Sequence, residues 1–322
     1  MTTHNRNAFV KSEYLNKDKV KVFIDLLSSH IMTANNFNHW YVDRKSKKTW
    51  ACNSVFNAYE NYRYPLIKKF RSNGSSDFES FRANSVVLSS LSGKLRSAYL
   101  NCKPGEKPTP KEASILLNQS QEILLWGGVA GSTKSGKKEG NYLWLETKYP
   151  NGTGLVTAYH NAEKVMLSDT PDLLTIGKNG IRSNAGFAKI YSLLFDNFII
   201  YDSRVAATLG LFAIKCCQEN GWDDIPEELN FNWMPAKESP KQSQAKRRNA
   251  SNQGRILNKV NNEQQHAWAN IRANWIFETI FEEGRRSGSS PFDEIKKRQD
   301  KIRALESAFF MIGYDLGDHS YL

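Results

Sequence analysis

The chain has 322 residues, 40% of them hydrophobic, and its 44 Lys and Arg residues exceed its 33 Asp and Glu residues by 11. This apolar content allows one large folded domain or two smaller ones that share an interface. The positive charge attracts polyanions, of which nucleic acid is the first candidate. No run approaches the ~20 apolar residues of a membrane span, and the start of the chain lacks the apolar core of a secretion signal, so we expect a cytoplasmic protein.

The cysteines and histidines predict neither a metal site nor disulfides. Among Cys52, Cys102, Cys216 and Cys217 there is no Cys-x-x-Cys pair, and the last two are neighbours, which seldom bond to each other. The six histidines show no spacing typical of metal ligands. We therefore expect free thiols, no metal and no cofactor.

Apolar residues recur at helical spacing in the first hundred residues, from Val20 to Ile31 and again between 81 and 99. The stretch "KPGEKPTP" (103–110) then separates these helices from another at about 111–126. We therefore expect a helical N-terminal region at 1–102, basic and rich in aromatic residues, and a second domain at 111–322.

The centre of the chain has a mixed pattern. The stretch "GGVAGSTKSGKKEGN" is a loop by composition, and "YLWLETKYPNGTGLVTAYH" is either a hairpin that turns at Asn151 and Gly152 or two short helices. We favour the small β-hairpin. Further helices are predicted near 161–168, 184–196, 203–219 and 256–283, and after a cap at Ser290. The predicted fold is therefore mainly α.

One glycine-rich stretch imitates a nucleotide-binding loop. "GSTKSGKK" (131–138) has the Gly-x4-Gly-Lys spacing, but Lys138 stands where magnesium coordination needs Ser or Thr, and no clean buried strand precedes it. Lysine has no oxygen to offer a metal ion. A basic loop that contacts DNA phosphates is the better interpretation.

Two stretches concentrate the basic charge. In 39–71 basic residues alternate with Trp and Tyr, which stack on bases or sugars in nucleic-acid-binding proteins. In 237–259 basic residues greatly outnumber acidic ones, and the Ser, Gln and Asn content is typical of a mobile loop. Both stretches are candidates for DNA contact; the alternative for each is a solvated surface or a flexible loop.

The segment "NFIIYDSRVAATLG" (197–210) brings an acid out of an apolar run just before a predicted helix. Asp202 is a favoured helix cap, which needs no function, but a cap also holds a carboxylate ionised at a helix N-terminus. A Gly-rich turn with Arg182 precedes it, and backbone N–H groups at such turns bind phosphate. Asp202 is therefore a candidate for both capping and catalysis.

These residues carry a resemblance to a known family. "IYDSRVAATLG", with "AKIYSLLF" before it and the closing "RALESAFFMIGYDL", resembles the helix-hairpin-helix DNA glycosylases, and in particular bacterial proteins with the 8-oxoguanine DNA glycosylase fold, which are similar to anti-phage glycosylases. The likeness covers roughly 110–322. It departs from the family at "NGIRSNAGFAK", where the hairpin usually reads Leu-Pro-Gly-Val-Gly, and the four-cysteine iron–sulfur loop of some members is absent.

The resemblance implies a glycosylase-like helical bundle that cleaves the bond between deoxyribose and a flipped, modified base, for example the glucosylated hydroxymethylcytosine of phage DNA, and leaves an abasic site. In this resemblance Asp202 takes the place of the family's catalytic aspartate. Lys189 resembles the lysine that attacks the sugar in bifunctional members, but it is only 13 residues from Asp202, so we expect monofunctional chemistry.

Further site residues follow from these considerations. For DNA contact we predict Arg182, Ser183, Asn184, Arg204, Lys246, Arg247 and Arg248. For the base pocket we predict Trp126, Tyr191 and Tyr201. The expected partner of this monomer is double-stranded DNA, damaged or from phage, and not a membrane.

Two alternatives stay open. One is a DNA-binding protein of a defence or repair system without chemistry, in which Asp202 only caps a helix and the basic stretches account for binding. The other is a nuclease, which needs metal-binding carboxylates that the sequence does not cluster.

Overall fold

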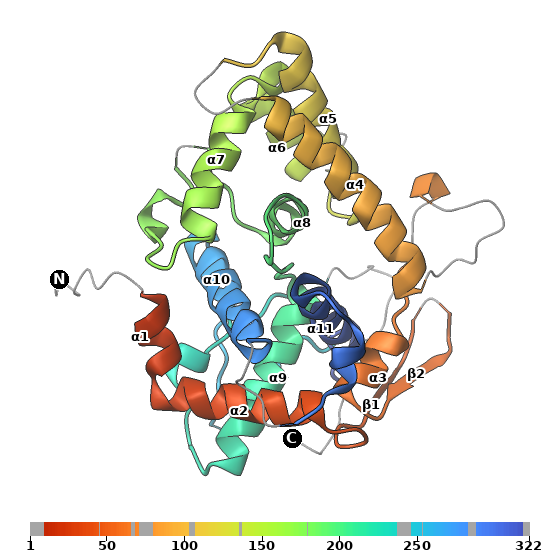
Figure 1. The fold of residues 1–322 in the computed structure, drawn as a ribbon, viewed down its shortest axis with the longest axis vertical. Helices are drawn as coiled ribbons and strands as arrows, with labels where there is room; N and C mark the ends of the chain where they lie inside the picture. The colour runs from red at the N-terminus through yellow and green to blue at the C-terminus, as the bar shows by residue number, and fades with distance from the viewer. Residues whose placement is uncertain are drawn as a thin grey trace.

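The protein is mainly helical, as predicted (Figure 1). The structure, a computed structural model, describes residues 10–317 apart from 45, 66–67, 71–79, 103–106, 135–136, 179, 237–245, 253 and 283–287. Within these residues no helix has both the length and the apolar character needed to cross a membrane.

The N-terminal region contains a β-hairpin that the helical prediction for 1–102 did not include. Strands β1 (His39–Val42) and β2 (Thr49–Cys52) pair antiparallel, with His39 opposite Cys52. Buried and exposed side chains alternate along both strands, the pattern of a two-residue repeat. The region is completed by α1 (Lys11–Asn16), α2 (Asp18–Met32), α3 (Val55–Glu60) and α4 (Phe81–Asn101), with a short 3-10 helix at Lys68–Phe70.

Helix α5 (Pro110–Trp126) begins where the sequence predicts, because a capping box forms at its first turn. The Thr109 hydroxyl accepts a hydrogen bond from the Glu112 N–H, and the Glu112 carboxylate accepts one from the Thr109 N–H. Pro110 occupies the first helical position, where its missing N–H costs no hydrogen bond.

The favoured hairpin at 142–160 is wrong, and the alternative of two short helices is confirmed. Helices α6 (Asn141–Lys148) and α7 (Leu155–Met166) are joined by a 3-10 turn, Pro150–Gly152. Asn151 and Gly152 both have positive φ, as in a hairpin turn, but here they reverse the chain between helices and press against α5. A short antiparallel pair does occur nearby, between β3 (Ser132–Lys134) and β4 (Lys137–Glu139).

The remaining helices follow the predicted order. They are α8 (Ala185–Leu194), α9 (Ser203–Glu219), α10 (Glu263–Ile280) and α11 (Arg298–Ile312), with 3-10 helices at Leu173–Thr175, Glu227–Leu229 and Pro291–Glu294. Helix α10 begins later than predicted because Asn262 caps it, its side chain accepting a hydrogen bond from the Gln265 N–H.

One hydrophobic core, extending from Tyr14 to Leu316, includes residues of both predicted regions. Helix α8, seen end-on at the centre of Figure 1, packs against α4 and α5, while α2 packs on α9 and α10, and α11 packs on α3 and α9. All four cysteines are free and buried in this interior. The N-terminal region is therefore joined to the rest through buried apolar contacts.

Replacing Gly152 by alanine is expected to lower the free energy of unfolding by more than about 2 kcal/mol, because a side chain is strained at φ +80 and the new Cβ would lie 1.9 Å from the Ala113 carbonyl oxygen. Gly177 has the same φ, +80, and open space around it, so Gly177→Ala is the control, with an expected loss of about 1 kcal/mol from the backbone alone. Urea unfolding measures both losses. Equal losses would contradict the close contact with α5.

Candidate functional site

The residues just before Asp202 form a buried segment outside any helix or strand, 198–201, whose backbone bonds to side chains of other helices. The Ile199 N–H donates to Asn274 Oδ1 of α10 at 3.0 Å, and the Ile200 N–H donates to Glu306 Oε2 of α11 at 2.8 Å. A buried N–H without an acceptor costs about 1–3 kcal/mol, so these two side chains fix the path of the segment. They thereby fix the position of Asp202.

His266 ties the same segment to the start of α8. Its Nε2 lies 3.0 Å from the Tyr201 carbonyl oxygen, and its Nδ1 lies 2.8 Å from Ser183 Oγ. The carbonyl can only accept, so Nε2 carries the proton and Nδ1 accepts from the serine hydroxyl. Burial lowers the pKa of His266 to about 4, and the ring is neutral at physiological pH. A neutral imidazole therefore connects the residues before Asp202 and before α8.

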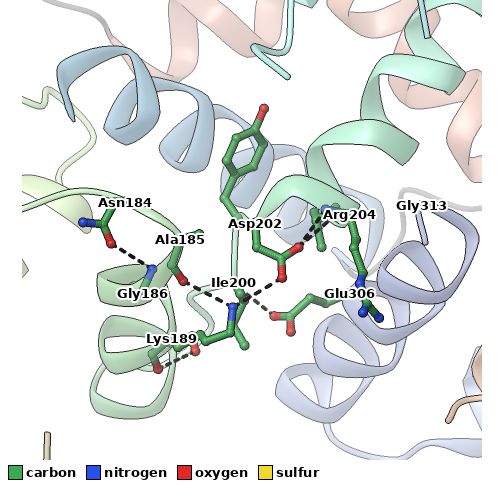
Figure 2. A network of polar contacts seen from close by, with 12 residues as sticks. Asn184, Ala185, Gly186, Lys189, Ile200, Asp202, Arg204, Glu306 and Gly313 are labelled. Atoms are coloured by element: carbon green, nitrogen blue, oxygen red, sulfur yellow. Dashed lines mark hydrogen bonds and ion pairs between the residues drawn. The ribbon is translucent and has the colours of Figure 1, made fainter. Parts of the chain in front are cut away.

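Asp202 caps α9 and also faces a lysine (Figure 2). Its Oδ1 accepts hydrogen bonds from the N–H groups of Arg204 at 2.9 Å and Val205 at 3.3 Å. Its Oδ2 lies 3.3 Å from Nζ of Lys189. The residue is 8% exposed. The predicted capping role of Asp202 is therefore confirmed, and the structure adds that its carboxylate is buried beside a lysine.

Lys189 reaches Asp202 from α8, and Glu306 of α11 lies nearby (Figure 2). Its Nζ also donates to the Ala185 carbonyl at 3.3 Å. Its hydrocarbon chain passes directly over Gly127 at the end of α5, where an added Cβ would lie 2.3 Å from Lys189 Cδ. A side chain at this position would therefore displace the lysine chain from its path to Asp202.

The charge of Asp202 is stabilised by its neighbours. Burial alone raises the pKa of its carboxyl, but Lys189, Arg204 and the Arg204 N–H outweigh burial, so the pKa lies below its ordinary value. Asp202 is therefore an ionised, buried carboxylate at neutral pH. Burial raises the pKa of Glu306, against the opposing charge of Arg303, which donates a hydrogen bond to Glu306 at 2.6 Å.

Lys189 and Asp202 line a narrow pocket with aromatic walls, formed by Tyr62, Tyr64, Trp126 and Phe310. Tyr64 stacks on Trp126 with 5.3 Å between ring centroids, and its hydroxyl donates to the Trp126 carbonyl at 2.9 Å.

A buried amide locks these rings in place. Trp126 Nε1 donates to Asn84 Oδ1 at 3.0 Å, and Asn84 Nδ2 donates to the Tyr62 hydroxyl at 3.0 Å. Because Tyr62, Tyr64 and Asn84 belong to the N-terminal region, that region completes the pocket. The sequence resemblance does not extend to it.

Of the three predicted pocket aromatics, only Trp126 lines this pocket. Tyr191 and Tyr201 lie in the core, where their hydroxyls donate to the carbonyls of Arg182 and Asn232, each at 2.8 Å. The aromatic pocket residues that the sequence did not single out are Tyr62, Tyr64 and Phe310, although the two tyrosines lie within the stretch 39–71 that was marked for stacking. The two tyrosines are two residues apart in the chain. Their two-residue spacing puts both rings on one side of an extended chain, which is the signal that could have indicated them.

The predicted DNA-contact residues before α8 make internal contacts. Asn184 caps α8 by accepting from the Gly186 and Phe187 N–H groups. The Arg182 guanidinium lies 4.6 Å from the Trp144 ring centroid, and its Nε lies 3.4 Å from the Glu263 carboxylate. These side chains shape the start of α8.

The basic stretch 237–259 differs from the predicted mobile loop. Residues 237–245 lie outside the described residues, but Arg248 is 4% exposed and donates to the Gly313 carbonyl. Arg247 donates to the carbonyls of Asn249 at 3.1 Å and Gly317 at 3.2 Å. The side chains of Arg247 and Arg248 thus bond to backbone carbonyls and hold this segment against the end of α11. Their guanidinium groups are engaged within the protein. Lys246 lies over the Tyr314 ring, with 5.3 Å between its Nζ and the ring centroid.

No family model matches the chain, and neither characterised proteins nor solved structures show significant similarity to it. Within the described part of the chain, no three or more His, Cys, Asp or Glu side chains gather as a metal site would require.

His266 predicts a pH dependence of stability. The folded protein holds it neutral with a pKa of about 4, against an ordinary value of 6.5, so the unfolded chain binds more protons below pH 6.5. Its contribution is complete above pH 6.5 and falls as the pH drops toward 4, by about 2 kcal/mol at pH 5. Urea unfolding at pH 7 and pH 5 measures this loss, which His266→Gln is expected to abolish and His160→Gln to preserve. An unchanged pH dependence in His266→Gln would contradict the assignment.

Proposed function

We propose that the protein is a DNA glycosylase that hydrolyses the bond between deoxyribose C1′ and a flipped base, with its active site in the pocket of Asp202 and Lys189. The observation that carries the proposal is the ionised Asp202 carboxylate, buried beside a lysine at the base of an aromatic-walled pocket. A buried charge pair is costly to maintain, and charged groups with shifted pKa values in pockets are typical of catalytic sites.

The aromatic walls suit a base taken out of the DNA stack. Tyr64 and Trp126 line the pocket and stack on each other, and a base that joins this stack recovers part of the few kcal/mol that flipping costs. The pocket is narrow in the absence of DNA, so we expect the rings to separate when a base is inserted. A modified base, such as glucosylated hydroxymethylcytosine, would need room at the pocket mouth.

Bond cleavage leaves positive charge on the sugar, and Asp202 stabilises it. A carboxylate that stays ionised next to C1′ lowers the energy of this oxocarbenium-like state. Asp202 also orients a water molecule and accepts its proton as the oxygen bonds to C1′. The electron pair of the broken bond leaves with the base, which ends with the proton, and the sugar becomes an abasic site.

In this mechanism Lys189 keeps Asp202 ionised and fixed in place. Its Nζ is held between the Asp202 carboxylate and the Ala185 carbonyl, both at 3.3 Å. A lysine whose amine donates to two acceptors is poorly placed to attack the sugar as a nucleophile. This favours a monofunctional enzyme. Attack by this amine on C1′, with strand cleavage, is the bifunctional alternative.

The runner-up function is a DNA-binding protein without chemistry. The cap that Asp202 makes on α9 favours it, because capping alone explains an aspartate at this position. This alternative leaves the buried lysine and the aromatic pocket without a role. Release of a base from DNA discriminates between the two functions.

Asp202→Asn is expected to lower base release by at least about a hundredfold, because asparagine still caps α9 but removes the charge beside C1′. The measurement is incubation with genomic DNAs that carry different modifications, mass spectrometry of released bases, and counting of alkali-labile sites. Asp172→Asn is the matched control, since Asp172 also caps a helix but is exposed and lies outside the pocket. Full activity in Asp202→Asn would refute the proposal.

The single variant leaves the Lys189 charge buried without its partner, which typically costs about 3–5 kcal/mol. The double variant Lys189→Met with Asp202→Asn removes both charges. We expect it to regain stability in urea unfolding and to remain inactive, so that loss of activity is separated from loss of folding.

Lys189→Gln is expected to shift the acidic limb of the pH–rate profile to higher pH, because Lys189 is the strongest of the charges that lower the pKa of Asp202. Rates of base release between pH 4 and 8 measure the shift. Reduction with borohydride during the reaction is expected to trap no covalent complex with wild-type protein. A trapped complex that Lys189→Gln abolishes would instead assign strand-cleaving chemistry to this lysine.

A further inference from the structure

A second pocket lies next to the first and has a different lining. Its walls come from the hairpin β1–β2, the start of α9 and the end of α11. Arg63 and Arg204 line it, together with Lys246 and the rings of Tyr41 and Tyr314. It is more polar than the Asp202 pocket, and its charged residues are mostly basic.

One short segment separates the two pockets. Tyr62 and Tyr64 face the Asp202 pocket, while Arg63, between them, lines the second pocket. The same division occurs in the first turn of α9, where Asp202 belongs to one pocket and Arg204 to the other. A ligand in the second pocket therefore contacts residues that adjoin, in the chain, those around the proposed catalytic carboxylate.

The guanidinium of Arg204 is held in place by aromatic rings. It lies 4.0 Å from the Phe310 ring centroid and 4.9 Å from that of Tyr314. Stacking of this kind leaves the N–H edges of the guanidinium available. Neither Arg204 nor Arg63 has a carboxylate partner within 4.0 Å among the described residues. Other arginines do have one, such as Arg96, which pairs with Asp196 at 2.6 Å.

Basic side chains outnumber acidic ones in the lining of this pocket. Asp43 is its one acidic lining residue, and its carboxylate already accepts hydrogen bonds from the Ser46 N–H at 2.7 Å and the Ser46 hydroxyl at 2.8 Å. Behind the pocket lies the buried Arg248, whose pKa is lowered by burial and by Arg204. Several positive charges held together repel one another, and a bound anion relieves that repulsion.

We propose that this second pocket binds a phosphate group of the DNA backbone that flanks the flipped nucleotide, with Arg63 and Arg204 as its donors. Guanidinium groups match phosphate geometry with paired N–H donors, and a phosphate held beside the Asp202 pocket fixes the flipped nucleotide. The assignment rests on the proposed glycosylase function for the identity of the strand. It gives the hairpin β1–β2 and the segment that follows it a role in DNA binding.

The test is a double-mutant cycle between protein and DNA. The DNA is a duplex with a tetrahydrofuran abasic analogue, in which one phosphate at a time near the analogue is replaced by an uncharged methylphosphonate. Arg63→Gln is expected to weaken binding about threefold to tenfold at 150 mM salt and to reduce the slope of log K against log salt by about 1. Arg63 is exposed, so the fold is expected to remain unchanged.

At one position, the methylphosphonate is expected to weaken binding of the wild type but to have little further effect on Arg63→Gln. Arg82→Gln is the matched control, because Arg82 is also an exposed arginine but lies outside this pocket, on α4. Its losses are expected to add to those of the methylphosphonate at every position. Additive losses for Arg63→Gln at every position would overturn the phosphate assignment.

The failures of the two proposals differ. Additive losses together with Asp202-dependent base release would refute only the phosphate pocket. A non-additive position without base release from any DNA would support the pocket and refute the glycosylase. A protein that binds neither this duplex nor intact DNA would refute both.

Discussion

The site depends on a buried segment that belongs to no helix or strand of the described structure. Residues 198–201 run through the core, and a backbone in that position must find hydrogen-bond partners without a sheet. Asn274, Glu306 and His266 supply them from α10 and α11. Each of these polar side chains would be costly to bury alone, and each is satisfied by the backbone that it stabilises. The result is a rigid support that delivers Asp202 to the first turn of α9.

That support explains why a charge pair can be kept at the end of the segment. A buried Lys–Asp pair contributes little net stability, since desolvation offsets the attraction between the charges. Lys189 and Asp202 nevertheless share their pocket with four aromatic rings, and Gly127 leaves space for the lysine chain to cross. Several independent features thus converge on one place, which is the pattern of a functional site and exceeds what a helix cap requires.

Local patterns in the sequence predicted local structure well. Helical periodicity located most helices, and the cap at Asp202 followed from its residue type and position. The prediction was wrong at 142–160, because Asn151-Gly152 supplies positive φ for a turn between helices as readily as between strands. The pocket itself was largely inaccessible from sequence. Tyr62 and Tyr64 meet Trp126 only through folding, and Arg248 is buried with its guanidinium bonded to the Gly313 carbonyl, which no local pattern indicates.

The N-terminal region has a larger part in the site than its sequence suggests. Without Tyr62, Tyr64 and Asn84 the Asp202 pocket would lack one wall and the amide that orients Trp126, so the residues of 111–322 alone would expose a charged pair to water. Water weakens electrostatic interactions and lets unproductive geometries compete. The same segment carries Arg63 to the neighbouring pocket. Residues 62–64, which follow α3, therefore both shield the carboxylate from water and contribute positive charge beside it. In the proposed function this would couple DNA binding to the assembly of the pocket.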